Sequence, residues 1–232
     1  QTDIYALTFG SYAYQDIFMR ETLYINGQLK ERLKINNILT MINNEDTVLD
    51  TPIANATNLR AYLNDLAGDY MQPDEDIALL YLTSHGGETE GLSVELNYRF
   101  SQNNLPPETL ADILDQSGIK NKIIIISACY SGTFIPHLQD ENTMIITAAA
   151  SDRTSFGCSD ENDLTYFTQA FFEALSESTD LEAAFHLAKE KIEKREADEG
   201  LSPPSSPQIF VGENIKSILK NYSAAPLTAL EE

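Results

Sequence analysis

Apolar runs alternate with amphipathic segments along this chain. The runs are continuous, are rich in β-branched residues and predict strands that are buried on both faces of a parallel sheet. They lie within residues 3–10, 37–43, 77–87, 122–132 and 143–150, and a shorter strand is predicted at 208–212, after the helix-breaking sequence SPPSSP. In the third and fourth runs the apolar residues give way abruptly to polar residues at the carboxyl end.

The segments between these runs carry apolar residues at helical spacing. The predicted helices are residues 14–32, a stretch from Leu59 to Leu66 capped by Asn55 or Thr57, a stretch from Pro106 to Gly118, and two stretches after a polar loop at residues 151–163. Strands joined by helical crossovers predict an α/β fold of three layers, with helices flanking a mostly parallel central sheet. We expect a single domain over residues 1–232, with a polar C-terminal tail from about residue 221.

The charge of the chain narrows the choice of partner. Its 232 residues include 36 acidic and 15 basic ones, and the net charge of -21 argues against nucleic acid as a partner, because binding phosphates needs clustered Lys and Arg.

No apolar stretch approaches the roughly 18 residues that predict a membrane-spanning helix. The first residue is Gln1 rather than Met, so we expect a missing N-terminal segment and an extracytoplasmic protein, periplasmic or membrane-tethered, rather than a cytoplasmic one. The oligomeric state stays open.

One histidine and one cysteine lie where chemistry is expected in such a sheet. His85 follows the third apolar run and precedes Gly86 and Gly87, and Cys129 follows the fourth run. Because parallel strands end at a common edge, the two residues are expected to lie close together. A thiol becomes a strong nucleophile when it loses its proton, and histidine titrates near neutral pH. The sequence therefore predicts Cys129 as a nucleophile and His85 as its base.

Other kinds of site have less support in the sequence. His137 and His186 do not precede a glycine and are interpreted as surface or structural residues. A cysteine phosphatase loop needs Arg six residues after the cysteine, where this chain has Ile135, and the patterns GxSxG, GxxxxGK and GxGxxG are absent. No His or Cys cluster has zinc-ligand spacing, so we predict neither a metal nor an organic cofactor.

The segments that carry His85 and Cys129 resemble a known family. LYLTSHGG and IIISACYSG are joined by LPPETLADIL and are followed by ITAAASDRTSFGC, LTYF and SPQIFVG. Together they resemble the legumain-type (asparaginyl endopeptidase-like) cysteine peptidases, particularly the bacterial branch. The resemblance implies a caspase-like fold, with His-Gly and Cys at adjacent strand ends, and the same assignment of base and nucleophile. The N–H groups of Gly86 and Cys129 are expected to form the oxyanion hole.

Substrate contacts are predicted from the resemblance and from one loop. The positions that match the Arg and the acidic residues of the legumain pocket are Gln15, Ser127 and Gln169, and because all three are neutral a preference for Asn is not carried over. The polar loop at residues 151–163 leaves a strand at the edge that holds Cys129, so Asp152 and Arg153 are expected to contact substrate. Its acidic residues either favour cationic substrates or are simply solvated.

The sequence thus predicts a cysteine endopeptidase that acts on peptides or proteins through an acyl-enzyme. Two alternatives stay open: a transpeptidase that uses the same acyl-enzyme, and a catalytically silent binding module of the same fold. Cys158, in the polar loop, either forms a reversible disulfide with Cys129 under oxidation or is an unreactive loop thiol.

Overall fold

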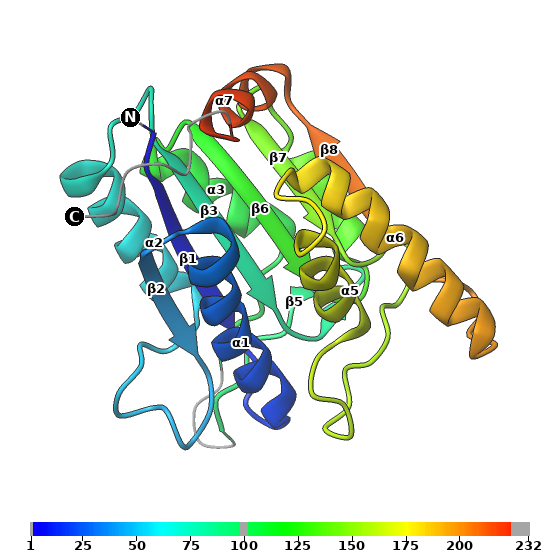
Figure 1. Ribbon diagram of the computed structural model, residues 1–232. Helices are drawn as coiled ribbons and strands as arrows, with labels where there is room; N and C mark the ends of the chain where they lie inside the picture. The colour runs from blue at the N-terminus through cyan, green and yellow to red at the C-terminus, as the bar shows by residue number, and fades with distance from the viewer. Residues whose placement is uncertain (1, 98–101, 224–232) are drawn as a thin grey trace.

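The computed structural model describes residues 2–97 and 102–223 and has a six-stranded sheet at its centre (Figure 1). The strands are β1 (Ile4–Gly10), β2 (Asn37–Ile42), β3 (Ile77–Thr83), β6 (Asn121–Ser127), β7 (Thr143–Thr147) and β8 (Gln208–Val211), in the spatial order β2-β1-β3-β6-β7-β8. The first five are parallel, and β8 is antiparallel to β7 at one edge. A small separate hairpin pairs β4 (Gly86–Gly87) with β5 (Gly91–Leu92).

Helices cover both faces of the sheet. One face packs against α1 (Asp16–Leu33), α5 (Tyr166–Leu175), α6 (Leu181–Asp198) and α7 (Glu213–Ser223). The other packs against α2 (Ala56–Asp65), the π-helical turn η1 (Leu66–Tyr70), α3 (Pro107–Ser117) and the short pair η2 (Ser131–Phe134) and α4 (Ile135–Leu138). The predicted three-layer α/β fold with a mostly parallel central sheet is confirmed.

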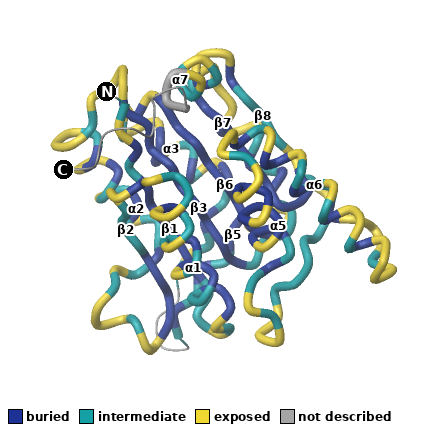
Figure 2. Tube along the Cα trace, in the orientation of Figure 1, coloured by how far each residue is buried: buried dark blue, intermediate teal, exposed yellow. Residues whose placement is uncertain are grey.

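The continuous apolar runs are explained by this layering, because each central strand is buried on both sides (Figure 2). In β3, Leu79 and Tyr81 join the core beneath α1 and α5, whereas Leu80 and Leu82 join the core beneath α2 and α3. Alternate side chains of a strand point to opposite faces, so a strand between two helical layers needs apolar residues at every position. Each fully buried Leu contributes about 1.5–3 kcal/mol relative to its exposed state.

Two helix ends follow the predicted capping. The side chain of Asn55 accepts a hydrogen bond from the N–H of Asn58 at 2.8 Å, so Asn55 rather than Thr57 caps α2. Helix α3 begins after Pro106, and the chain leaves it through Gly118, whose φ of 71° lies in the left-handed region.

One predicted strand is too long. The apolar run at residues 143–150 predicts a strand throughout, but β7 ends at Thr147. After that point the backbone bonds to other segments: Ala149 accepts a hydrogen bond from the N–H of Gly132 at 2.9 Å, and the N–H of Ala150 bonds to Ser205. These contacts bring the end of the run beside the turn that follows Cys129. Periodicity did not predict the β4–β5 hairpin, whose strands have only two residues each.

The carboxyl ends of β1, β3, β6 and β7 lie at one edge of the sheet, at the lower end of the strands in Figure 1. The loops that leave this edge therefore meet. In the parts of the chain that the structure describes, no helix is long and apolar enough to cross a membrane.

Candidate active site

His85 and Cys129 leave neighbouring strands at the same level. Thr83, the last residue of β3, pairs with Ser127, the last residue of β6, and each candidate follows two residues later. The turns stay in contact beyond the strands, because the N–H of Ser84 donates to the carbonyl of Ser127 at 3.3 Å. An ideal Cβ added at Gly86 would lie 2.1 Å from the carbonyl oxygen of Cys129. The turn after His85 thus packs directly on the backbone of Cys129.

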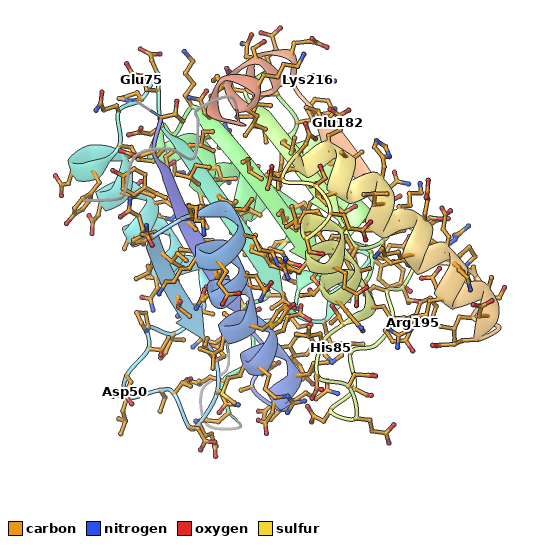
Figure 3. All side chains as sticks on the ribbon, viewed as in Figure 1. Asp50, Glu75, His85, Glu182, Arg195 and Lys216 are labelled. Carbon is orange, nitrogen blue, oxygen red and sulfur yellow. The ribbon has the colours of Figure 1, made fainter. Side chains whose placement is uncertain are left out.

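The ring of His85, labelled in Figure 3, is held by three side chains. Tyr12 and Phe18 pack edge-on against it, with ring centroids 4.6 Å and 5.0 Å away. The side-chain oxygen of Gln15 hydrogen-bonds Nε2 of His85, and its side-chain nitrogen donates to the carbonyl of Cys158 at 3.1 Å. The second bond fixes the orientation of the amide, so the oxygen faces the imidazole and Nε2 carries the proton. The lone pair of the neutral ring is therefore on Nδ1.

Burial lowers the pKa of His85, because a charged imidazolium would lose hydration in this pocket. The aromatic rings of Tyr12 and Phe18 are part of the surface that excludes water. The histidine is accordingly held in its neutral, proton-accepting form at neutral pH.

The sulfur of Cys129 lies against Ser155, and when it is protonated it donates to the Ser155 carbonyl at 3.6 Å. The N–H of Ser155 donates to Sγ at 3.3 Å, and the Ser155 hydroxyl lies 3.6 Å from it. Cys158 follows Ser155 by three residues in the same loop, and its thiol is the neighbouring group that most favours the ionised form of Cys129 and so lowers its pKa. These donors, first the Cys158 thiol and then Ser155, outweigh the opposing effect of burial and lower the pKa of Cys129 to about 6. The pKa of Cys158 is raised, because its proton is shared with Cys129.

Two backbone N–H groups near the sulfur are available to a ligand. The N–H of Ser93 donates to the carbonyl of His85 at 2.9 Å, which makes Gly86 and Leu92 a non-hydrogen-bonded pair of the β4–β5 hairpin. The hairpin therefore leaves the N–H of Gly86 unused. The N–H of Cys129 lies beyond the end of β6 and faces its own sulfur. Within residues 2–97 and 102–223, neither group bonds to an oxygen of another residue.

A fully buried carboxylate connects the strand ends beneath the site. Glu21 of α1 accepts hydrogen bonds from the Thr83 hydroxyl at 2.7 Å and from the N–H of Thr165 at 2.8 Å. The hydroxyl of Thr165 in turn lies 3.1 Å from that of Ser127. One side chain of α1 thus connects the end of β3, the start of α5 and the end of β6.

Comparison with known proteins gives the family of the chain. The sequence model of the Peptidase C13 family matches residues 7–214, which is most of the chain and includes both His85 and Cys129. The chain belongs to the Peptidase C13 family. This is the legumain family, so the predicted resemblance to legumain-type cysteine peptidases is confirmed. A search of curated proteins finds no match.

Among solved structures, the fold of this C13 family member is similar to that of caspase-1 from Spodoptera frugiperda. The two share 16% sequence identity with a TM-score of 0.61, over 90% of this chain and 86% of the caspase. At this level of identity the likeness concerns the fold alone, and it confirms the predicted caspase-like architecture. Family and fold together identify a cysteine peptidase.

The residues predicted from the sequence to contact substrate do not form one cluster. Gln15 lies against His85, and Ser127 is buried beneath Cys129 with only 2% of its surface exposed. Arg153 pairs with its neighbour Asp152, and its carbonyl accepts a hydrogen bond from the N–H of Tyr130 at 2.7 Å, so this part of the loop adjoins the Cys129 turn. The side chain of Gln169 lies in the groove between α5 and α6, where it bonds Glu173 and Arg195.

The two other histidines lie on the outer sides of their helices. His137 is exposed in α4, and His186 is exposed in α6, where its ring packs edge-on against Phe185 with the centroids 5.4 Å apart. Among the described residues, no three His, Cys, Asp or Glu side chains are grouped so as to hold a metal ion.

An open pocket of about 330 Å³ adjoins the Gln15 segment. Its lining residues are Ala13, Tyr14, Asp16, Asn44, Glu45, Asp46 and Leu96. Three of these residues carry carboxylates, which produce a local negative potential that favours cationic side chains. The pocket lies at the carboxyl ends of β1 and β2, on the same edge of the sheet as His85.

Sequence reasoning missed four residues of the site: Tyr12, Phe18, Glu21 and Ser155. Only Glu21 had a visible signal, because it lies between Phe18 and Ile25 on the apolar stripe of its helix, where a charged residue is unexpected. Ser155 looks like any other serine of a polar loop, and only the path of that loop brings it to Cys129.

Proposed function

We propose that the chain is a cysteine endopeptidase in which Cys129 is the nucleophile and His85 the general base, and that it cleaves peptide bonds through a thioester acyl-enzyme. One observation carries the proposal: His85 and Cys129 follow paired strand ends, and the turn after His85 packs on the backbone of Cys129, whose thiol pKa is lowered to about 6. A lowered thiol pKa is a property of reactive cysteines, whereas a structural buried thiol has a raised one.

The chemistry follows from the tautomer of His85. Nδ1 holds the lone pair, and as Sγ of Cys129 attacks the substrate carbonyl it carries the proton of the thiol or, where the thiol is already ionised, a proton taken from water. Nδ1 then delivers that proton to the departing amine, which leaves the thioester. In the second half of the reaction Nδ1 takes a proton from water, the hydroxide attacks the thioester, and the cysteine departs as the sulfur recovers its proton. The roles of acid and base alternate on one nitrogen.

The N–H groups of Gly86 and Cys129 would bind the oxyanion of the tetrahedral intermediate. Both are free of other oxygen acceptors among the described residues, and Gly86 packs against the Cys129 backbone, which keeps the two groups together. Removal of one such donor typically costs about 10²–10³-fold in rate.

Substrate is assigned to the edge of the sheet that the loop at residues 151–163 borders. Asp152 and Arg153 lie next to the Cys129 turn and are proposed to contact the peptide, and the acidic pocket beside Gln15 would favour a basic side chain. The side chain of Ser127 is buried, so it is not proposed to touch the peptide directly. It is proposed to support the substrate-binding edge through its hydroxyl contact with Thr165.

The test is covalent labelling with a panel of peptidyl acyloxymethyl ketones that differ in the residue before the warhead. Wild type, Cys129→Ala, His85→Ala and the exposed control His137→Ala are treated alike, and the label is located by mass spectrometry. We expect Cys129 to be labelled in wild type and in the His137 variant, and labelling to be much slower without His85. A preference for basic over acidic residues would support the assigned pocket.

Two results would contradict the proposal. If no probe labels Cys129 under reducing conditions, the chain is a silent binding module rather than an enzyme. If His85→Ala reacts as fast as wild type, His85 is not the base. A thioester that is captured by added amines faster than by water would instead identify a transpeptidase with the same two residues.

A further inference from the structure

We infer that Cys129 and Cys158 form a peroxide-sensitive thiol pair, in which Cys158 captures oxidised Cys129 as a reversible disulfide. The pair requires no peptidase activity, and only its effect on catalysis rests on the proposed function. The sequence contains these two cysteines and no others. They are 29 positions apart, and the fold brings the loop of Cys158 against Cys129: the N–H of Ser155 donates to Sγ of Cys129 at 3.3 Å, and Gln15, which bonds His85, also bonds the carbonyl of Cys158.

The loop that carries Cys158 is attached on both sides of that residue. The carbonyl of Cys158 accepts a hydrogen bond from the side chain of Gln15 at 3.1 Å. Two residues later, the carboxylate of Asp160 accepts from the N–H of Ile17 at 3.0 Å, at the first turn of α1. On the other side, the N–H of Ser155 donates to Sγ of Cys129 at 3.3 Å. Cys158 is thus kept next to the nucleophile rather than free to move away.

The two thiols differ in reactivity, and the difference sets their order of reaction. Cys129 is the more acidic of the two, because it accepts hydrogen bonds from Cys158 and Ser155, whereas Cys158 keeps its proton. Thiolates react with peroxides and thiols do not, so Cys129 is oxidised first. Both cysteines are half-buried rather than sealed within the core, so a small oxidant can reach the pair.

The chemistry balances with hydrogen peroxide as the oxidant. The Cys129 thiolate attacks one oxygen of the peroxide, an S–O bond forms, the O–O bond breaks, and hydroxide leaves and takes up a proton to become water. The sulfur of Cys158 then attacks that of Cys129, an S–S bond forms, the S–O bond breaks, and the released hydroxide takes the Cys158 proton. Two thiols and one peroxide give one disulfide and two waters.

The disulfide would have two consequences for Cys129. It removes the nucleophile while the oxidant is present, and it prevents further oxidation to the sulfinic acid, which thiols do not reduce. A dithiol restores both residues by exchange through a mixed disulfide. Cys158 would therefore make the loss of the nucleophile reversible.

The experiment treats the purified chain with hydrogen peroxide, blocks remaining thiols and digests it with trypsin without reduction. Arg153 separates the cysteines, so Cys129 falls in the peptide 123–153 and Cys158 in 154–189. We expect wild type to give the two peptides joined, about 2 Da lighter than their sum. In Cys158→Ser, which keeps a hydroxyl donor, we expect the 123–153 peptide to become about 32 Da heavier instead.

Recovery provides the second readout. After peroxide and then dithiothreitol, wild type should regain alkylation of Cys129 by iodoacetamide, whereas Cys158→Ser should regain about tenfold less. In Cys129→Ala, Cys158 should stay unmodified at the same peroxide concentration, because it loses the partner with which it is oxidised.

Two results would overturn the inference: absence of the joined peptide in wild type, or equal recovery of wild type and Cys158→Ser. None of these readouts uses a peptide substrate. A chain that forms the disulfide but cleaves nothing would therefore contradict only the proposed function.

Discussion

The side-chain oxygen of Gln15 accepts a hydrogen bond from Nε2 of His85. The two residues are 70 positions apart, and the other end of the same amide bonds the backbone of Cys158, 143 positions away. One neutral side chain at the N-cap of α1 therefore orients the imidazole and anchors the loop that carries Cys158. Because Gln15 has no charge, it sets the tautomer of His85 without favouring the imidazolium form.

Substitution of Gln15 tests that relationship. Gln15→Ala should lower the rate of Cys129 labelling by an active-site probe about 10²-fold, because the imidazole loses its fixed orientation. Gln15→Glu should restore part of the rate, since a carboxylate accepts the same hydrogen bond, and should raise the pKa of His85 through its negative charge. The exposed Gln139→Ala serves as the control. A rate in Gln15→Ala equal to that of the control would show that His85 is oriented by other contacts.

The acidity of Cys129 predicts the pH profile of alkylation. The thiolate is the reactive form, so the rate of iodoacetamide labelling at Cys129 should rise with pH through about 6 and level off above it. Labelling is followed by mass spectrometry of the 123–153 peptide. Ser155→Ala should move the midpoint upward, because the thiolate loses the Ser155 hydroxyl as a donor. A wild-type midpoint near the ordinary thiol pKa of about 8.5 would contradict the assigned environment.

Gly86 should not tolerate a side chain. In Gly86→Ala the new Cβ would lie 2.1 Å from the Cys129 carbonyl, a backbone atom that moves only with the strand end. We expect a loss of about 1–3 kcal/mol in the free energy of unfolding and a large loss of probe labelling. Gly27→Ala is the matched control, because nothing lies within 4 Å of its Cβ position on the exposed side of α1, and it should stabilise the chain by about 0.4–1 kcal/mol. Equal urea midpoints for the two variants would disprove the close contact.

Glu21 should contribute to the stability of the folded chain. Glu21→Gln replaces one carboxylate oxygen by an amide nitrogen, which cannot accept from both Thr83 and the N–H of Thr165. The buried donor left unpaired should cost about 1–3 kcal/mol in urea unfolding. Glu31→Gln, on the exposed side of the same helix, should change stability by less than about 0.5 kcal/mol. If the two variants unfold at the same urea concentration, the carboxylate does not hold the strand ends together.

The architecture could be predicted from the sequence because the patterns that determine it involve neighbouring residues or the ends of paired strands. The run at residues 77–83 is apolar at every position, which a strand between two helical layers requires, and β3 covers it. The prolines and the glycine around α3 mark its ends by their own backbone preferences. His85 and Cys129 were predicted to lie together because parallel strands end at a common edge, and the register of β3 and β6 places them so.

The surroundings of those two residues could not be predicted in the same way. Ser155 and Tyr12 reach the site from loops whose paths depend on distant hydrogen bonds, such as the N–H of Tyr130 to Arg153 and the bridge between Tyr12 and Glu95. The resemblance placed Gln15, Ser127 and Gln169 in one substrate pocket, whereas the fold separates them into a contact with His85, a buried network and a surface groove.

The sequence by itself determined the layers, the approximate limits of most elements, the family and the two residues that carry the proposed chemistry, because hydrophobic periodicity and short motifs act over a few positions. The tertiary structure decided the tautomer of His85, the acidity of Cys129 and the approach of the Cys158 loop to Cys129. These properties depend on hydrogen-bond donors and on side chains that exclude water, and those groups come from segments up to 143 positions apart in the chain. Only the folded chain brings these segments within hydrogen-bond distance.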